Sequence, residues 1–153
     1  MRHIISILLQ NEAGALARVA SLFSTRGYNI ESLSVAPTED PQVSRLTLVT
    51  IGSDEVINQI NKQLFKLVDV VNFADMTLGD HIERELMLVK LRVKDGALAS
   101  LRELHDQHLV RVLDDAPGNY TLEMTGTGNQ IEDFLDRAEN LADILAIVRS
   151  GPP

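Results

Sequence analysis

The sequence predicts an α+β protein that contains two successive units with the same order of elements, β-α-β-β-α-β. Three observations predict it: apolar stretches of strand length, amphipathic stretches of helix length between them, and a return of the whole order after about 75 residues. The chain has 153 residues, 44% of them hydrophobic, which is enough to bury two small cores or one of medium size. We therefore expect two domains, at residues 1–77 and 78–153.

The first unit begins with a strand and a helix. Residues 3–10 are apolar on both faces, which is typical of a strand covered on both sides and indicates a sheet face reserved for another domain or subunit. Residues 15–26 are amphipathic, and Gly27 is the expected end of this helix. Its apolar positions at helical spacing are Leu16, Val19, Ala20 and Phe23.

The rest of the first unit completes a ferredoxin-like arrangement. Pro37-Thr38-Glu39-Asp40-Pro41 has the composition of a turn between two strands, and Gly52-Ser53-Asp54 has that of a helix start. The predicted elements are strands at 30–36 and 43–51, a helix at 54–67 and a strand at 68–73.

The second unit repeats this order without repeating the sequence. Its predicted elements are a strand at 85–93, a helix at 97–107, strands at 109–114 and 120–125 around Ala116-Pro117-Gly118-Asn119, a helix at 130–140 and a strand at 144–148. The junction Thr77-Leu78-Gly79-Asp80-His81 is short and polar. The predicted fold is therefore two tandem ferredoxin-like domains.

Composition argues against several classes of function. There is no cysteine, which excludes disulfides and thiolate chemistry. The 14 basic and 22 acidic residues give a net charge of -8, which opposes binding to nucleic acids or anionic membranes. RNA-recognition modules share the predicted element order, but they stack bases on strand aromatics, and this chain has two Tyr, four Phe and no Trp. Because no long apolar run or charged leader is found, the cytoplasm is the expected location.

No constellation of side chains indicates catalysis. His105 and His108 have a spacing that can hold a metal ion, but Asp106 and Gln107 between them favour a solvated helix end. Gly126-Thr127-Gly128 lacks the Lys-Ser/Thr of a phosphate loop and is interpreted as a turn. We expect no catalytic residues, no metal site and no cofactor in this chain.

The first β-α turn is the best candidate for a binding site. In Asn11-Glu12-Ala13-Gly14-Ala15-Leu16 the glycine allows close approach, and the N–H groups at the helix start can bind a carboxylate. Asn11 can accept a hydrogen bond from an ammonium group, and Asn29, beyond the helix, can add an acceptor from a neighbouring chain. Ala13, Gly14 and Ala36 leave a small apolar volume, so the features fit an α-amino acid with a short branched side chain.

The same residues also fit purely structural roles. Asn11 is a good helix cap, Gly14 a turn residue and Asn29 a residue that enters a strand. Residue types and spacing alone leave both interpretations open.

Three segments of the sequence resemble one family. They are ISILLQNEAGALARVASLFSTRGYNIESLSVAPTEDPQVSRLTLVT, QLFKLVDVVNFADMT and ERELMLVKLRV, and they resemble the regulatory (small) subunit of acetohydroxyacid synthase, also called acetolactate synthase. The match is nearly continuous from Met1 to about Val93, and its most specific parts are Asn-x-x-Gly-x-Leu and Gly-Tyr-Asn-Ile-Glu-Ser-Leu. The resemblance implies that the first domain is an ACT domain, an amino-acid-sensing version of the predicted fold, followed by a second ferredoxin-like domain.

The resemblance also implies a function. The expected protein is a non-catalytic subunit that forms a homodimer through its ACT domains, activates a separate catalytic subunit in branched-chain amino acid (valine, isoleucine, leucine) biosynthesis, and confers feedback inhibition by valine. Thiamine diphosphate, Mg²⁺ and FAD are expected in that catalytic partner and not in this chain.

The resemblance further implies where valine binds. Effector residues fall on Asn11, Gly14, Asn29, Ala36 and Gln59, with the first β-α turn of one chain facing residues near Asn29 of another. We do not expect Asn11 and Asn29 of one chain to close on the same ligand, because a whole helix separates them. The full predicted site comprises Asn11, Ala13, Gly14, Ala15, Leu16, Asn29, Ile30, Ala36 and Gln59.

Two other hypotheses stay open at this point. A stand-alone amino-acid-sensing ACT adaptor for another enzyme would share the pocket and differ in its partner. A small ferredoxin-like enzyme of the acylphosphatase kind would need a phosphate loop with Arg and Asn in fixed positions, which the sequence does not show.

Overall fold

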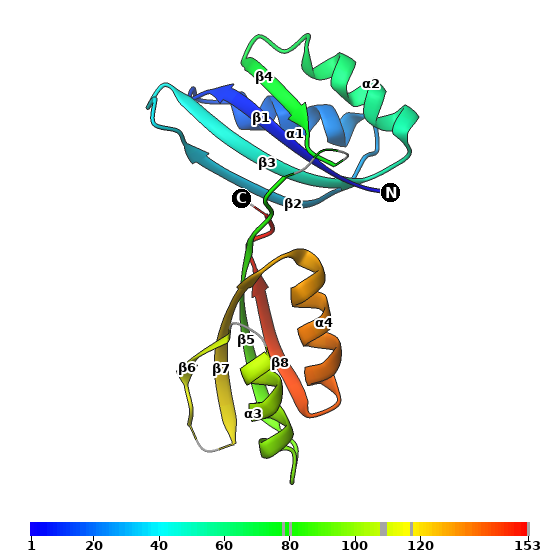
Figure 1. The fold of residues 1–153 in the computed structure, drawn as a ribbon. Coiled ribbons are helices and arrows are strands. Elements are labelled where there is room, and N and C mark those ends of the chain that lie inside the picture. Colours follow the sequence, from blue (N-terminus) through cyan, green and yellow to red (C-terminus); the bar gives the residue numbers. More distant parts are fainter. Residues whose placement is uncertain (78, 80, 108–109, 117, 153) are drawn as a thin grey trace. The chain divides into compact units, whose positions relative to one another are not determined.

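The computed structural model describes residues 1–77, 79, 81–107, 110–116 and 118–152. The chain divides into two compact units, Met1–Ile82 and Glu83–Gly151 (Figure 1). The residues outside the described part include Leu78 and Asp80 of the predicted junction, His108 of the histidine pair, Leu109 at the start of a predicted strand, and Pro117 of the predicted hairpin. No helix in the described part is long and apolar enough to cross a lipid bilayer.

The first unit is a four-stranded antiparallel sheet with two helices (Figure 1). The strand order is β2-β3-β1-β4, so β2 and β4 form the two edges of the sheet. In chain order the elements are β1 (Arg2–Gln10), α1 (Ala15–Thr25), β2 (Ile30–Pro37), β3 (Val43–Ile51), α2 (Asp54–Leu64) and β4 (Val70–Asp75).

The core of the first unit lies between its helices and one face of the sheet. Its fully or almost fully buried residues are Ile5, Ile7, Leu9, Val19, Phe23, Leu46, Leu48, Ile57, Ile60 and Leu64. On α1 the buried positions are Ala15, Val19 and Phe23, whereas Leu16, expected on the apolar stripe, is exposed. The buried positions follow a spacing of four residues from Ala15, which leaves Leu16 off the buried face, while Val19 and Phe23 are buried as predicted.

The connection between α2 and β4 differs from the prediction. α2 ends at Leu64, three residues before its expected end, because the chain tightens there and the Leu67 N–H donates to the Leu64 carbonyl at 3.1 Å. A turn follows, so the strand predicted at 68–73 begins instead at Val70. Val68 is therefore exposed in a loop and does not lie in the sheet.

The second unit has the same architecture. Its elements are β5 (Glu85–Val93), α3 (Leu98–Gln107), β6 (Val110–Asp114), β7 (Asn119–Gly126), α4 (Gly128–Glu139) and β8 (Ala142–Arg149). The strand order β6-β7-β5-β8 is equivalent to that of the first sheet. The predicted fold class, two tandem βαββαβ domains, is confirmed. The predicted turn at Gly126-Thr127-Gly128 is confirmed as well, since it joins β7 to α4.

Two groups of polar contacts stabilise the second unit, one at this turn and one between β8, β5 and α4. The Thr127 hydroxyl accepts from the Gln130 N–H at 3.2 Å, and the Gln130 side chain accepts from the Thr127 N–H at 2.9 Å, a reciprocal capping box at the start of α4. Arg149 at the end of β8 donates to the buried carboxylate of Glu85 at 2.5 Å and also pairs with Glu132 of α4. The hydrogen bond that Arg149 donates to Glu85 is the main reason that the pKa of Arg149 lies above its usual value.

The capping box gives a stability prediction for the second unit. Thr127→Ala removes the hydroxyl acceptor and leaves the Gln130 N–H unpaired, so α4 is expected to open more easily by about 1 kcal/mol. Amide hydrogen exchange of residues 131–138 measures this opening. Thr127→Ser keeps the acceptor oxygen and is the matched control, which is expected to exchange at nearly the wild-type rate. Equal protection in both variants would contradict the role of the cap.

Candidate functional site

The turn between β1 and α1 has an uncapped helix start. Gly14 is the N-cap of α1, has a positive φ of 86° and offers no side chain to the first turn. The starts of α2 and α4 are capped by the hydroxyls of Ser53 and Thr127. Within the described residues the N–H groups of Leu16 and Ala17 have no acceptor, and the first turn of α1 carries no acidic side chain. Unpaired N–H groups at a helix start attract an anion.

Asn11 lies beside this helix start and is held by the β2–β3 hairpin. Its backbone N–H donates to the Gln42 carbonyl at 2.7 Å, and its side-chain Nδ2 donates to the Pro41 carbonyl at 3.0 Å. The interpretation of Asn11 as the helix cap is therefore wrong, because the cap position belongs to Gly14 three residues later. With Nδ2 engaged in this way, the Asn11 Oδ1 is left as an acceptor on an exposed side chain.

An ion pair between α1 and the connection before β4 stabilises the turn. Arg18 of α1 pairs through Nε with the buried carboxylate of Asp69. The Asp69 carbonyl in turn accepts the N–H of Gln10, the last residue of β1, at 2.8 Å. The hydrogen bond from Arg18 is the main reason that the pKa of Asp69 lies below its usual value, while desolvation acts in the opposite direction. The same pair raises the pKa of Arg18.

A shallow groove of about 440 Å³ runs along the outer side of α1 from this turn. Small residues form much of its floor, and arginines lie at both ends. The lining residues are Gly14, Ala17, Arg18, Ser21, Leu22, Thr25, Arg26 and Leu67.

The predicted effector residues do not gather at one place in a single chain. Asn11, Ala13 and Gly14 precede α1, and Asn29 and Ile30 follow it. The 11 residues of α1 span about 16 Å at 1.5 Å per residue, so the two groups lie at opposite ends of the helix. Leu16 is exposed near the first group, whereas Ala15 is buried in the core, where it has no free surface for a ligand.

The second group includes Gln59 of α2. The Tyr28 hydroxyl donates to the Gln59 side-chain carbonyl at 3.2 Å, next to Asn29 in sequence. The Asn29 carbonyl accepts from the Thr50 hydroxyl at 2.7 Å, which fixes the start of β2 while the Asn29 side chain is exposed. Ala36 lies at the far end of β2 and lines a separate small hollow with Arg45.

Sequence reasoning missed three members of this region: Arg18, Asp69 and Tyr28. Arg18 stands four residues after Gly14. Because residues four apart lie on the same side of an α-helix, the position of Arg18 beside the turn could be predicted from the sequence. Asp69 lies 51 residues farther along the chain, and no local pattern connects it with Arg18. Tyr28 belongs to the quoted family motif, but its contact with Gln59 depends on how the two helices pack.

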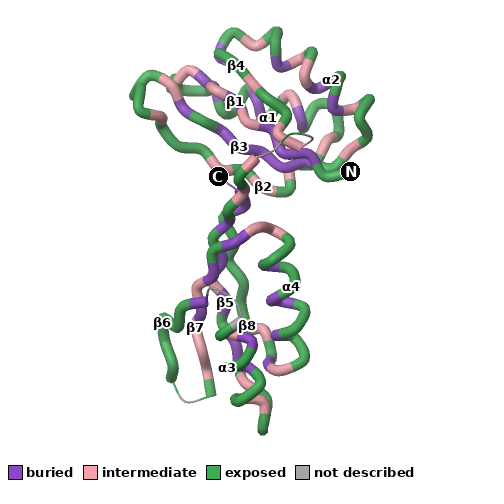
Figure 2. The backbone as a smooth tube through the Cα atoms, in the orientation of Figure 1, coloured by how far each residue is buried: buried purple, intermediate pink, exposed green. Residues whose placement is uncertain are grey.

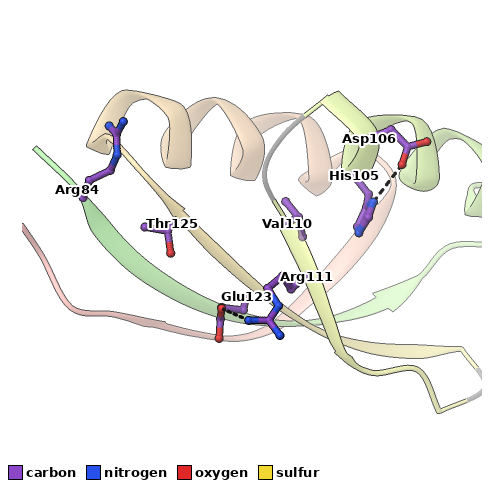
Figure 3. A pocket seen from close by; sticks show the side chains of 7 residues that line it. All are labelled: Arg84, His105, Asp106, Val110, Arg111, Glu123 and Thr125. Atoms are coloured by element: carbon purple, nitrogen blue, oxygen red, sulfur yellow. Dashed lines mark hydrogen bonds and ion pairs between the residues drawn. The ribbon is translucent and has the colours of Figure 1, made fainter.

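The second unit has a hollow of its own, of about 600 Å³ (Figure 3). Its lining includes Arg84, Val110, Thr125 and two side-chain pairs, His105 with Asp106 at 3.2 Å and Arg111 with Glu123 at 3.9 Å. Asp106 and Arg111 are exposed, whereas His105 and Glu123 are half-buried. Among the described residues no cluster of three or more histidine and acidic side chains could hold a metal ion. His108, the other half of the predicted metal pair, lies outside them.

Comparison with known proteins identifies the family. A family model for an AHAS small subunit-like ACT domain matches residues 5–72, and a model for the small subunit of acetolactate synthase matches residues 84–152. The Escherichia coli acetolactate synthase isozyme 3 small subunit is 45% identical over 151 residues, which cover 99% of this chain and 93% of that protein. The chain belongs to the acetolactate synthase small-subunit family.

Other members of this family match the chain over nearly its whole length. The Haemophilus influenzae acetolactate synthase small subunit is 43% identical over 99% of this chain and 93% of its own length. The crystal structure of the acetolactate synthase small subunit from Thermotoga maritima superposes with a TM-score of 0.84 at 31% identity, covering 100% of this chain and 95% of that one. The expected family is therefore confirmed. The chain is a regulatory small subunit, and it implies a catalytic large-subunit partner.

Gly14→Ala tests how the turn of this small subunit is supported. A Cβ at Gly14 would lie 2.9 Å from Arg18 Nη1, so Arg18 is expected to move away from Asp69 and the pKa of Asp69 to rise toward its ordinary value. Gly27→Ala is the matched control: its φ of 73° carries a similar backbone strain of about 1–2 kcal/mol, but no atom lies within 4 Å of the added Cβ. Titration of the Asp69 carboxyl by NMR measures the effect. An equal shift in both variants, or none in Gly14→Ala, would contradict the proposed contact.

The ion pair also predicts how stability depends on pH. The folded pKa of Asp69 is lowered, so its contribution is fully present above the unfolded value of about 3.9 and is lost as pH falls through the folded value. Arg18→Gln is therefore expected to be less stable than wild type at neutral pH, with a difference that shrinks below about pH 4. Arg26→Gln makes the same charge change at the C-cap of the same helix and is expected to show no such trend. Urea unfolding between pH 3 and 7 provides the comparison.

Proposed function

We propose that this small subunit activates the catalytic subunit of acetolactate synthase and makes it sensitive to feedback inhibition by valine bound between two ACT domains. The observation that carries the proposal is the uncapped start of α1 at Gly14, with Asn11 held beside it. The catalytic partner supplies the chemistry and is the proposed holder of thiamine diphosphate, Mg²⁺ and FAD. This chain contributes binding and regulation only.

The chemistry of an α-amino acid matches the two polar features of the turn. Its carboxylate fits the unpaired N–H groups of Leu16 and Ala17, where the helix dipole favours negative charge. Its ammonium group fits the Asn11 Oδ1, which can only accept. Ala13, which is exposed beside the turn, adds a small apolar contact.

A second copy of the chain completes the site. Asn29 and Gln59 lie at the other end of α1 and reach the ligand only from a neighbouring subunit. The edge strand β2 supports such pairing, because its Leu33 and Val35 are 39% and 44% exposed on the same face of the sheet as α1. Leu16 on α1 is exposed beside the turn. Burial of these apolar side chains favours a homodimer through β2 and α1.

Valine can regulate only if it binds one arrangement of the dimer better than another. A ligand that binds both arrangements equally shifts nothing, and a difference of about 1–3 kcal/mol is enough for physiological control. A site shared by two subunits meets this requirement, since any change in their packing changes the distance between Asn11 of one chain and Asn29 of the other.

Reconstitution tests the proposal directly. A purified catalytic subunit is expected to gain activity when this small subunit is added and to lose that gain with millimolar valine. Asn11→Ala and Gly14→Asp are expected to keep the activation and lose the response to valine, because the first removes the acceptor and the second places a carboxylate at the anion site. Asn58→Ala, an exposed asparagine on α2 outside the predicted site, is the matched control. Full valine sensitivity in both site variants would contradict the placement.

Mixed dimers separate a shared site from a site within one chain. Asn11→Ala and Asn29→Ala homodimers are each expected to bind no valine in a calorimeter. A purified dimer with one subunit of each kind keeps one site in which both asparagines are intact, so it is expected to bind one valine. No binding by the mixed dimer would place both asparagines in the same chain.

A further inference from the structure

Exposed apolar side chains gather at the connection between α2 and β4. Phe65, Val68 and Val71 are 76%, 88% and 57% exposed. The Phe65 ring lies edge-on to that of Phe73, with centroids 4.6 Å apart. Figure 2 shows this connection as largely exposed. Single exposed apolar residues are ordinary, but a group of this kind on one short segment marks an interaction surface. We call the exposed Phe65, Val68 and Val71, together with the half-buried Phe73 that Phe65 contacts, the α2–β4 patch.

A β-bulge shapes the patch. Leu8 pairs with Asn72 and Leu9 with Val70, which leaves Val71 as the extra residue of the edge strand β4. A bulge re-aims the side chain of its extra residue and interrupts the strand edge for pairing with another strand. The patch therefore offers side chains to a partner and not a strand edge.

The charges around the patch are unlike those of the whole chain. Lys62 and Lys66, on either side of Phe65 in the chain, are both exposed, and the acids of the following segment are Asp69 and Asp75. Asp75 bonds to His3 and Thr77. The Asp69 carboxylate is buried and already paired with Arg18. An apolar patch with a cationic rim thus stands out on a chain of net charge -8. It fits a surface with an apolar centre and carboxylates around it, whereas a second copy would bring the same lysines.

The sheet topology is a second argument that the partner at the patch is not another copy of this chain. The proposed dimer uses β2, and β4 is the opposite edge of the same sheet. A two-fold contact uses the same surface on both subunits, so another self-contact at the β4 edge would extend the assembly beyond the dimer. A different protein at β4 leaves the dimer closed.

We propose that the α2–β4 patch is the surface by which this small subunit docks on the catalytic subunit of acetolactate synthase. The inference rests on the proposed function, because it takes the partner from there. It also explains how valine could act on docking: Asp69, within the connection that carries the patch, accepts the Gln10 N–H and binds Arg18. Asp69, which follows Val68 of the patch in the chain, therefore links this connection to the residues on both sides of the turn at Gly14.

The test measures docking on the purified catalytic subunit. Val68→Asp and Phe65→Ser are expected to raise, at least tenfold, the concentration of small subunit that gives half-maximal activation. Lys66→Glu is expected to raise it as well, mainly at low salt. Ile51→Asp is the matched control, because Ile51 is an apolar residue of the same domain with 58% exposure, and a change below twofold is expected. Circular dichroism and valine calorimetry verify that each variant is folded and binds effector.

The outcomes separate this inference from the proposed function. A wild-type chain that neither binds nor activates the catalytic subunit overturns the proposed function itself. Wild-type activation with unchanged half-maximal concentrations in the patch variants overturns the docking surface alone. So does a patch variant that changes only the oligomeric state, since the patch would then be a contact between copies. Protection of residues 65–71 from hydrogen exchange in the wild-type complex, absent in Val68→Asp, is the supporting result.

Discussion

The left-handed backbone of Gly14 is the constraint around which the first domain is arranged. Gly14 ends the turn that follows β1 and is the N-cap of α1. Because it has no side chain to cap the helix, the N–H groups of Leu16 and Ala17 in the first turn stay unpaired within the described residues. The helix direction that follows places Arg18 over the turn, where it meets Asp69. A residue with a Cβ at this position would disturb both the backbone and the ion pair. The same glycine thus creates an anion site and sets the contact that supports it.

Two edges of one sheet serve two kinds of contact in the proposed assembly. The β2 edge carries Leu33 and Val35 beside α1 and favours a second copy, whereas the β4 edge carries a bulge and a cationic rim and favours a different protein. The Arg18–Asp69 pair joins α1 to the connection before β4, and the Asp69 carbonyl also accepts the N–H of Gln10 at the end of β1. A change at the shared effector site therefore has a short physical route to the docking surface.

Much of this fold could be predicted from local pattern. Strand lengths, the helix start at Ser53 and the repeated βαββαβ order follow from periodicity and capping chemistry, which act within a few residues. The same local signals failed where two elements compete for one segment. At the end of α2 the periodicity continues to Leu67, but the chain must turn at Val68 to bring Val70 beside Leu9.

The sequence by itself determined the family, the element order and the Asn-x-x-Gly turn, because these depend on adjacent residues. Only the tertiary structure decided that Asn11 is held by Pro41, that Arg18 is paired with Asp69 and that Val71 forms a bulge. Each of these contacts joins segments 30 or more residues apart. No local pattern encodes them, since they arise when the sheet closes and burial selects one register. The separation of Asn11 from Asn29 by a helix, in contrast, follows from the amphipathic pattern of residues 15–26, and it is what makes a site shared between two chains the simplest arrangement.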